Sequence, residues 1–196
     1  MGHGNCLHGD MHEFIAGRFF ELILPERSTS TGISPCVVPR KAQFLRKGLV
    51  INMKELQFSI EINATKERVW ATLWEDKSFR NWASIIDEGT YMQGEMIQGN
   101  EIQFISSVNG YGVTSLIEKL IPNEFVLFRH SADTKDTGQQ EREKEWTGGT
   151  ESYALTKKNG VTALMVKTDV PQEMEKMFKS LLPRAMGRIK VLAEER

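Results

Sequence analysis

The C-terminal part of the sequence carries one long apolar stripe, and this stripe is the feature that most constrains the fold. Its apolar residues recur at steps of three and four with Lys and Glu opposite them, which predicts one long amphipathic helix. Asp169 and Pro171 suit the start of such a helix. Pro183 removes a backbone hydrogen bond within it and predicts a kink or an interruption. The stripe consists of Met174, Met177, Phe178, Leu181, Leu182, Ala185, Met186, Ile189, Leu192 and Ala193.

The residues before this helix have the pattern of strands. Apolar and polar residues alternate over 56–63, which predicts a strand with one buried face. Thr65 is a good N-cap for a short helix that carries the apolar residues of 69–74, and a second short helical segment spans 78–84. Further strands are predicted at 90–93, 101–108, 113–121, 124–130, 151–157 and 161–168.

Turn signals separate these strands and predict antiparallel pairing. Asn109-Gly110 and Asn159-Gly160 are hairpin signals, because both residue types tolerate positive φ, and Pro122-Asn123 is a similar break. The order is one strand, two short helices, about six strands and one long helix, which predicts an α+β protein. Its sheet must curl around the helix to bury both apolar faces, and a curled sheet of this kind tends to leave a ligand cavity beneath the helix.

The composition changes at Met53. Both cysteines and three of the four histidines lie before Met53, whereas all four tryptophans and all three tyrosines lie after it. We expect residues 1–52 to be an extension from an upstream start or from cloning, mostly disordered, with a functional appendage as the alternative. Residues 53–196 are then the working domain. His3, Cys6, His8 and His12 lack the paired spacing of structural zinc sites, so we expect no bound metal.

Charge and hydropathy argue against several classes of function. A net charge of −1 provides no general attraction for phosphate backbones, and no apolar run approaches the roughly 20 residues of a membrane helix. The G-x-G of residues 110–112 is followed by a strand rather than a helix, so it does not predict a dinucleotide site. We therefore expect a cytoplasmic protein that needs no cofactor, binds no nucleic acid and does not insert into a membrane.

Six sequence segments between residues 55 and 195 resemble, in order and spacing, the START-like or SRPBCC superfamily. The branch they resemble most is named after the activator of the 90-kDa heat-shock protein ATPase. The segments are FSIEINATKERVW (58–70), GYGVTS (110–115), PNEF (122–125), WTGGTESY (146–153), GVTAL (160–164) and TDVP (168–171). The resemblance implies a helix-grip fold with a hydrophobic cavity. It implies no fixed catalytic residues, because members range from lipid carriers to cyclases and co-chaperones.

These observations together predict a domain that holds a small apolar or amphipathic molecule between its sheet and its C-terminal helix. One alternative is a stress-related, co-chaperone-like domain that binds a protein partner or forms a homodimer. A second is a cyclase-like or hydrolase-like enzyme that uses the cavity. The predicted cavity residues, each of which could equally be packed core, are Trp82, Tyr91, Phe104, Tyr111, Phe128, Trp146, Met177, Phe178 and Leu181.

Four charged or titratable residues could contribute chemistry. His130 is the only histidine after Met53, but no nucleophile or orienting carboxylate can be paired with it from the sequence. Glu118 and Glu151 lie in strand patterns and are interpreted as solvated strand residues, with a carboxyl group in an apolar cavity as the alternative. Arg129 is interpreted as exposed, with an anchor for an acidic ligand as the alternative. We therefore expect no catalytic residue.

Overall fold

The computed structural model describes residues 52–135 and 146–195. The extension expected for residues 1–52, with its Cys and His residues, lies outside this part of the chain except for Asn52. In chain order the elements are β1 (Met53–Ile62), α2 (Lys66–Trp74), α3 (Asp76–Ala83), β2 (Thr90–Gln93), β3 (Glu101–Ser106), β4 (Tyr111–Ile121), β5 (Phe125–Lys135), β6 (Thr150–Lys158), β7 (Val161–Pro171), the 3₁₀ turn η1 (Gln172–Met174) and α4 (Glu175–Glu194).

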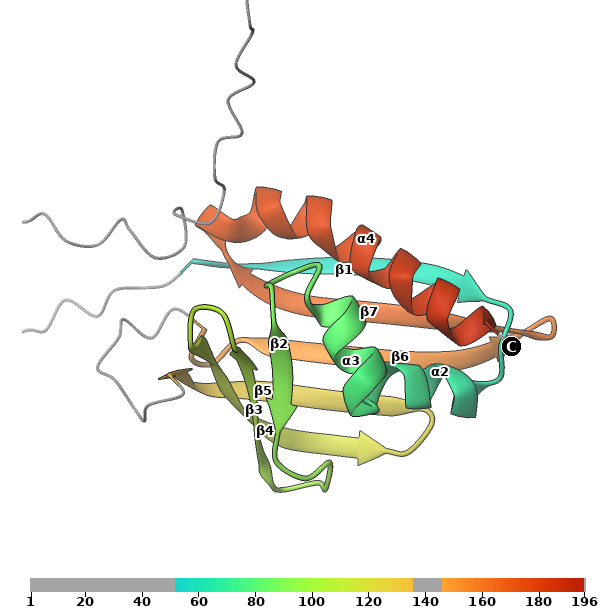
Figure 1. Ribbon diagram of the computed structural model, residues 1–196, viewed down its shortest axis with the longest axis horizontal. Coiled ribbons are helices and arrows are strands. Elements are labelled where there is room, and N and C mark those ends of the chain that lie inside the picture. Colours follow the sequence, from blue (N-terminus) through green and yellow to red (C-terminus); the bar gives the residue numbers. More distant parts are fainter. Residues whose placement is uncertain (1–51, 136–145, 196) are drawn as a thin grey trace, which may run out of the picture. The chain divides into compact units, whose positions relative to one another are not determined.

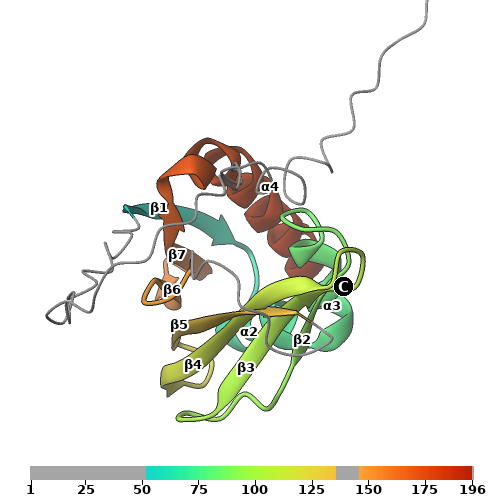
Figure 2. The ribbon, with the colours of Figure 1, turned by 90° about the vertical axis from the view of Figure 1, so that its left-hand side faces the viewer.

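The seven strands form one antiparallel sheet in the order β1-β7-β6-β5-β4-β3-β2. The sheet is curled, and α2, α3 and α4 all lie on its concave side (Figures 1 and 2). This is the predicted α+β architecture, and the helix-grip expectation is confirmed. The first strand of the chain pairs with the last, which places β1 directly beside the strand that leads into α4.

Local sequence features shape the elements as expected. Thr65 is the N-cap of α2, and its hydroxyl accepts a hydrogen bond from the backbone N–H of Arg68 at 3.3 Å. Asn123, in the turn between β4 and β5, has a φ of 65°, and Asn159, in the turn between β6 and β7, has a φ of 51°. A Cβ at Gly112 would lie 2.0 Å from the carbonyl oxygen of Phe104, so this position in β4 accommodates only glycine beside β3.

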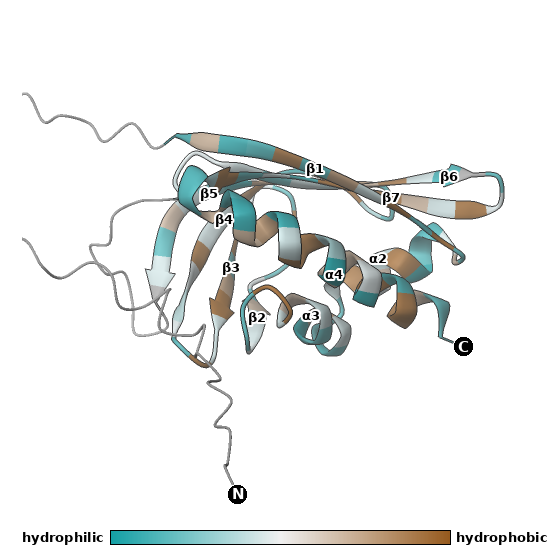
Figure 3. Ribbon diagram, turned by 90° about the horizontal axis from the view of Figure 1, so that it is seen from above, coloured by the Kyte–Doolittle hydropathy of each residue, from teal (hydrophilic) through white to brown (hydrophobic). Residues whose placement is uncertain are grey.

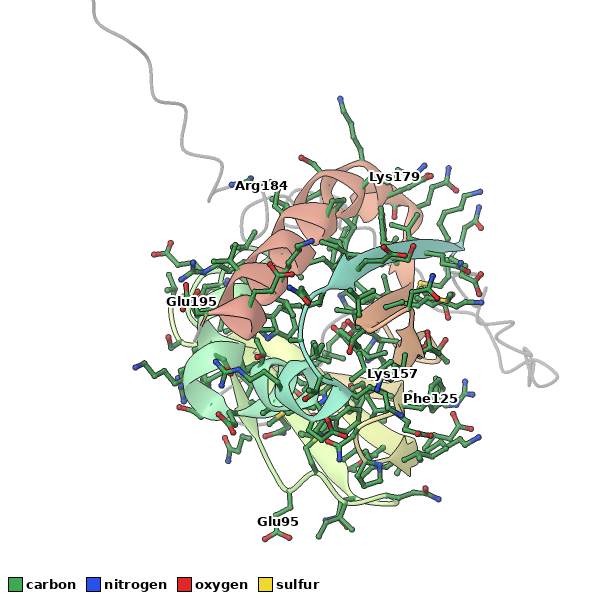
Figure 4. All side chains as sticks on the ribbon, turned by 90° about the vertical axis from the view of Figure 1, so that its right-hand side faces the viewer. Glu95, Phe125, Lys157, Lys179, Arg184 and Glu195 are labelled. Atoms are coloured by element: carbon green, nitrogen blue, oxygen red, sulfur yellow. The ribbon has the colours of Figure 1, made fainter. Side chains whose placement is uncertain are left out.

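The long helix continues through its proline, so the interruption predicted at Pro183 is absent. Residues Glu175–Glu194 form one helix with Pro183 inside it. The proline is exposed, and its ring therefore does not displace packing against the sheet. Hydrophobic and hydrophilic bands alternate along α4 (Figure 3), and Lys179 and Arg184 lie on its outer side (Figure 4).

Strand β5 is longer than predicted, because a bulge lets it continue past His130. One register shift, between Thr114 and Ser115, leaves Ser131 as an extra residue in β5. A second shift, between Ile117 and Lys119, leaves Glu118 as an extra residue in β4. A bulge of this kind reverses which residues face inward beyond it. The strand therefore extends to Lys135 although its last residues are polar.

An aromatic cluster fills the core beside α2 and α3. Phe128 is fully buried, and its ring centroid lies 5.5 Å from that of Trp74 and 5.3 Å from that of Phe104. Phe79 extends the cluster to Trp82 at 5.1 Å. Helix α4 covers this cluster with its buried residues, which are Leu182 near the middle of the helix and Ala185, Met186, Ile189 and Ala193 in its C-terminal half.

We expect Phe128→Ala to lower the free energy of unfolding by about 3–5 kcal/mol, since it removes a fully buried ring from a cluster with fixed neighbours. The matched control is Phe125→Ala in the same strand. Phe125 is half-buried and packs beneath the Lys119 ammonium, so its removal should cost about 1 kcal/mol. Urea unfolding measures both values, and equal losses would contradict this description of the core.

Candidate functional site

The packing of α4 against the sheet changes along the length of the helix. Met177, Phe178 and Leu181, in its N-terminal half, are only half-buried. Ile189 and Ala193, in its C-terminal half, are 1% and 4% exposed. The looser half lies over the end of the sheet where β7 leads into η1 and α4. We define the interior beneath residues 177–181 of α4 as the candidate site.

His130 lies on the interior face of β5, directly opposite Ser115 of β4. Both side chains are buried, and the Ser115 Oγ and His130 Nδ1 atoms lie 2.8 Å apart, within hydrogen-bond distance. The indole of Trp146 meets the His130 ring edge-on, with 5.8 Å between centroids. Trp146 in turn contacts Phe178 of α4 at 5.6 Å. These contacts connect the histidine with the looser half of the helix.

A carboxyl group lies on the same interior face of the sheet. We call this face, with its buried polar side chains, the interior wall. Glu151 of β6 pairs with Phe128 on one side and with Thr168 on the other, so the strand register places its side chain on the interior face. The Tyr153 hydroxyl donates a hydrogen bond of 2.5 Å to Glu151 Oε1. The ring of Tyr153 is buried against Trp74, with 5.0 Å between their centroids.

Burial shifts the pKa of each titratable group on this wall toward its neutral form. Burial lowers the pKa of His130 to about 4, although the Asp169 carboxylate acts in the opposite direction. Burial raises the pKa of Glu151, against the effect of the hydrogen bond from Tyr153. Burial, together with the neighbouring Glu151, raises the pKa of Tyr153. At neutral pH the wall therefore presents a neutral imidazole, a neutral phenol and a carboxyl group that resists ionisation.

The basic side chains whose positions are described lie outside this interior. Arg129 is exposed and forms an ion pair with Glu118 at 2.8 Å on the outer face of the sheet, which agrees with the interpretation of both residues as solvated. Lys190 and Arg188 of α4 are half-buried. Lys190 Nζ donates a hydrogen bond to the carbonyl oxygen of Glu61, and Arg188 Nε donates one to Asn81 Oδ1. The interpretation of Glu151 as solvated differs from the structure, because the register of β6 places it inward.

Of the nine predicted cavity residues, Phe178 contacts Trp146 at the candidate site, and Met177 and Leu181 lie on the same segment of α4. Three others, Trp82, Phe104 and Phe128, belong to the aromatic cluster. Tyr91 is not among the residues of either group. Arg80 stacks over the Tyr91 ring, and Met92 rather than Tyr91 packs against the core. Tyr111 is half-buried at the start of β4.

Ser115 and Tyr153 were not among the predicted site residues, and Glu151 was expected in the cavity only as the alternative to a solvated position. The spacing of Glu151 and Tyr153 did contain a signal, because residues two apart in a strand share a face and Tyr153 is followed at the same spacing by Leu155. Ser115 had no such signal, since a bulge sets its pairing with His130.

A surface hollow of about 800 Å³ lies away from the candidate site, where α2 meets the C-terminal end of α4. Its lining is largely polar and includes Asn63, Thr65, Arg68 and Glu194. None of the predicted cavity residues lines it. Within residues 52–135 and 146–195, no three His, Cys, Asp or Glu side chains are grouped in a way that could hold a metal ion. In the same ranges no helix is long and apolar enough to cross a membrane.

Comparison with known proteins supports the fold. No protein-family model and no curated protein matches the sequence. The structure is similar to the Aha1 dimer from Colwellia psychrerythraea, with a TM-score of 0.55 and 20% identity over 72% of this chain and 97% of that one. A protein from Arthrobacter aurescens matches with a TM-score of 0.56 and 14% identity over 75% of this chain and 93% of that one.

DynU16, a protein of the dynemicin biosynthetic locus, matches with a TM-score of 0.53 and 15% identity over 71% of this chain. The match covers 47% of DynU16, so this chain spans about half the length of that protein. The fold of this chain is the START-like, or SRPBCC, fold. At these identities the similarity shows the fold and does not show the function, which depends on the residues of the site.

The shifted pKa of His130 predicts a loss of stability in acid. The unfolded chain binds a proton at the ordinary histidine pKa of 6.5, whereas the folded protein does so only near pH 4. Stability should therefore fall as the pH drops from about 6.5 to about 4, by up to about 3 kcal/mol from this residue. Urea unfolding across this range should show a shallower acid loss for His130→Gln than for the wild type.

Glu151 should act in the opposite sense. Its raised pKa favours the folded state at low pH, and that contribution is lost as the pH rises from 4.5 through the raised value. Glu151→Gln removes this opposing contribution, so the variant should show a steeper acid loss than the wild type over the same range. Identical pH profiles for the wild type and both variants would contradict the placement of the two side chains in the interior.

Proposed function

We propose that the domain of residues 53–196 binds a small amphipathic molecule between its sheet and the N-terminal half of α4. The observation that carries this proposal is the contrast within α4. Ala185, Met186, Ile189 and Ala193 in its C-terminal half are buried, whereas Met177, Phe178 and Leu181 are only half-buried. A partly covered apolar surface beside a few inward polar groups is the usual composition of a small-molecule site.

Aromatic and aliphatic groups supply the apolar side of the proposed site. Trp146 and Phe178 contact one another, and Met177 adds a flexible side chain that adapts to the shape of a ligand. His130 and Glu151 supply the polar side. A molecule held there would place its apolar body under α4 and its polar group toward the sheet.

The distribution of exposed apolar residues gives less support to a protein partner. Among the residues described, the large apolar side chains that are exposed come from five separate segments. The two on the sheet, Ile121 of β4 and Met165 of β7, are separated by β5 and β6. A protein-binding surface is more often one contiguous patch.

Catalysis is a second candidate, because Glu151 and His130 share one face of the sheet and Glu151 has a raised pKa. A bound molecule that the wild type converts to a product of different mass, and that Glu151→Gln leaves unchanged, would support it.

The binding proposal predicts the effect of filling the site. The neutral dye N-phenyl-1-naphthylamine, which fluoresces in apolar surroundings, should bind the full chain. Leu181→Trp adds bulk at a half-buried position beneath α4 and should weaken dye binding at least about tenfold, since the larger ring occupies the space of the ligand. Fluorescence titration measures both affinities.

Val191→Trp is the matched control, because Val191 lies on the same helix and is 47% exposed. It should bind the dye as the wild type does. Absence of dye binding by the wild type, or equal binding by Leu181→Trp and the wild type, would contradict the proposed location.

A further inference from the structure

Strand β1 forms a long edge of the sheet. It is first in the strand order, with β7 on one side and, among the residues that the structure describes, no strand on the other (Figure 2). Its 10 residues contain no proline and pair with β7 in one unbroken register. The strand at the opposite edge, β2, has only 4 residues. Because natural edge strands are usually short, interrupted or covered, a long regular edge is a template for another strand.

The hydrogen bonds at the two ends of β1 show which backbone groups point away from β7. Residues of an antiparallel pair alternate between bonding toward the neighbouring strand and pointing away from it. The carbonyl oxygen of Asn52 accepts from the N–H of Gln172 on the β7 side, so the even-numbered residues of β1 bond toward β7. The odd-numbered residues point outward. Lys190 of α4 confirms this direction, since its Nζ donates to the carbonyl oxygen of Glu61 at 2.8 Å.

Helix α4 covers only one end of this edge. Besides the bond from Lys190 to Glu61, Glu194 Oε1 accepts a hydrogen bond from the backbone N–H of Asn63 at 2.6 Å. The two helix side chains also form an ion pair at 3.7 Å. Within the described ranges, no hydrogen bond reaches the outward backbone groups of residues 53–59. We call residues 53–59 the open edge.

We propose that the open edge pairs antiparallel with the open edge of a second copy of this chain, around a two-fold axis at Leu56. This axis lies at the middle of the open edge. It sets Met53 opposite Ser59 and Glu55 opposite Gln57, so that outward N–H groups meet outward carbonyl groups along the whole segment. The same surface serves both copies, as in any two-fold interface. The proposal concerns a surface separate from the candidate site and does not rest on the proposed function.

The charges of β1 select this register over its neighbours. Glu55 and Gln57 are exposed, and like charges directly opposite one another destabilise a strand pair. An axis at residue 55 would set Glu55 against the same residue of the second copy. An axis at Gln57 would set Met53 against Glu61, whose carbonyl oxygen already accepts from α4. The axis at Leu56 avoids both conflicts.

Pairing of this kind needs no apolar patch, because the backbone supplies the contacts. It therefore agrees with the separation of the exposed apolar side chains across the domain. One pair of strands is a small interface by the standard of stable dimers. We expect monomer and dimer to exchange in an equilibrium that depends on protein concentration.

Sedimentation equilibrium of the full chain, from micromolar to millimolar concentration, tests the proposal. The average mass should rise from that of one chain to that of two and then level off. A chain that stays monomeric over this range, as another strand on the open edge would cause, overturns the proposal. Assembly that continues beyond the dimer overturns it as well, because a two-fold pair of edges is closed.

Substitutions of Gln57 locate the interface and its register. Gln57→Glu faces Glu55 of the second copy twice, so it should raise the dimer Kd about fivefold at low ionic strength, and Gln57→Lys should lower it by about the same factor. Within one copy, Gln57 is opposite Lys167 of β7. The glutamate should therefore stabilise the monomer against urea and the lysine should destabilise it, so a general loss of folding cannot imitate the effect on the Kd.

The matched controls are Gln93→Glu and Gln93→Lys, at an exposed glutamine in the other edge strand, β2. Both should leave the dimer Kd unchanged. Gln57→Pro removes an outward N–H without breaking a bond to β7, and it should abolish the dimer. Equal Kd values for the wild type and both charged Gln57 variants, or equal effects at Gln93, overturn the proposal. If Gln57→Pro does not fold, the charged variants still decide it.

Discussion

The packing of α4 into the concave face of the sheet is the contact on which the rest of the structure depends. The sheet curls because its inner face and the helix stripe are both apolar and must cover each other. Strands β1 and β7 pair at one edge, so the strand that begins the domain and the one that leads into α4 share a single scaffold. The aromatic cluster around Phe128 forms one buried core with Leu182, Ala185, Met186, Ile189 and Ala193 of the helix.

The polar residues of the interior wall lie on the sheet, and His130 is linked to the N-terminal half of the helix through Trp146 and Phe178. Ser115, His130 and Glu151 come from three adjacent strands, and burial drives the histidine and the carboxyl group toward their neutral forms. Such groups lower stability where they lie unless a partner satisfies them. His130 is linked to the least covered part of α4 through Trp146 and Phe178, and this link is the physical basis for proposing a ligand site there.

The order and type of the elements could be predicted from the sequence, but the polar residues of the interior wall could not. The stripe of α4, the N-cap Thr65 and the asparagine turns are local signals, and each predicts an element that the structure contains. The inward direction of Glu151 depends on which face of β6 is buried, and both faces of that strand carry polar residues. The pairing of Ser115 with His130 depends on a bulge at Glu118 between this pair and the β4–β5 turn, and no local sequence pattern predicts that bulge. The continuation of α4 through Pro183 also depends on tertiary packing, because the proline lies on the exposed side of the helix.

The central claim is that apolar space for a ligand lies beneath Met177, Phe178 and Leu181 of α4 and not beneath Ile189 and Ala193. Methyl NMR of the full chain under increasing xenon pressure tests it directly, because xenon enters apolar voids that are large enough to hold it. The account predicts large, saturating shift changes for the methyl groups of Met177 and Leu181, with small changes for Ile189 and Ala193. Saturating changes at Ile189 and Ala193, or small linear changes throughout, would contradict it.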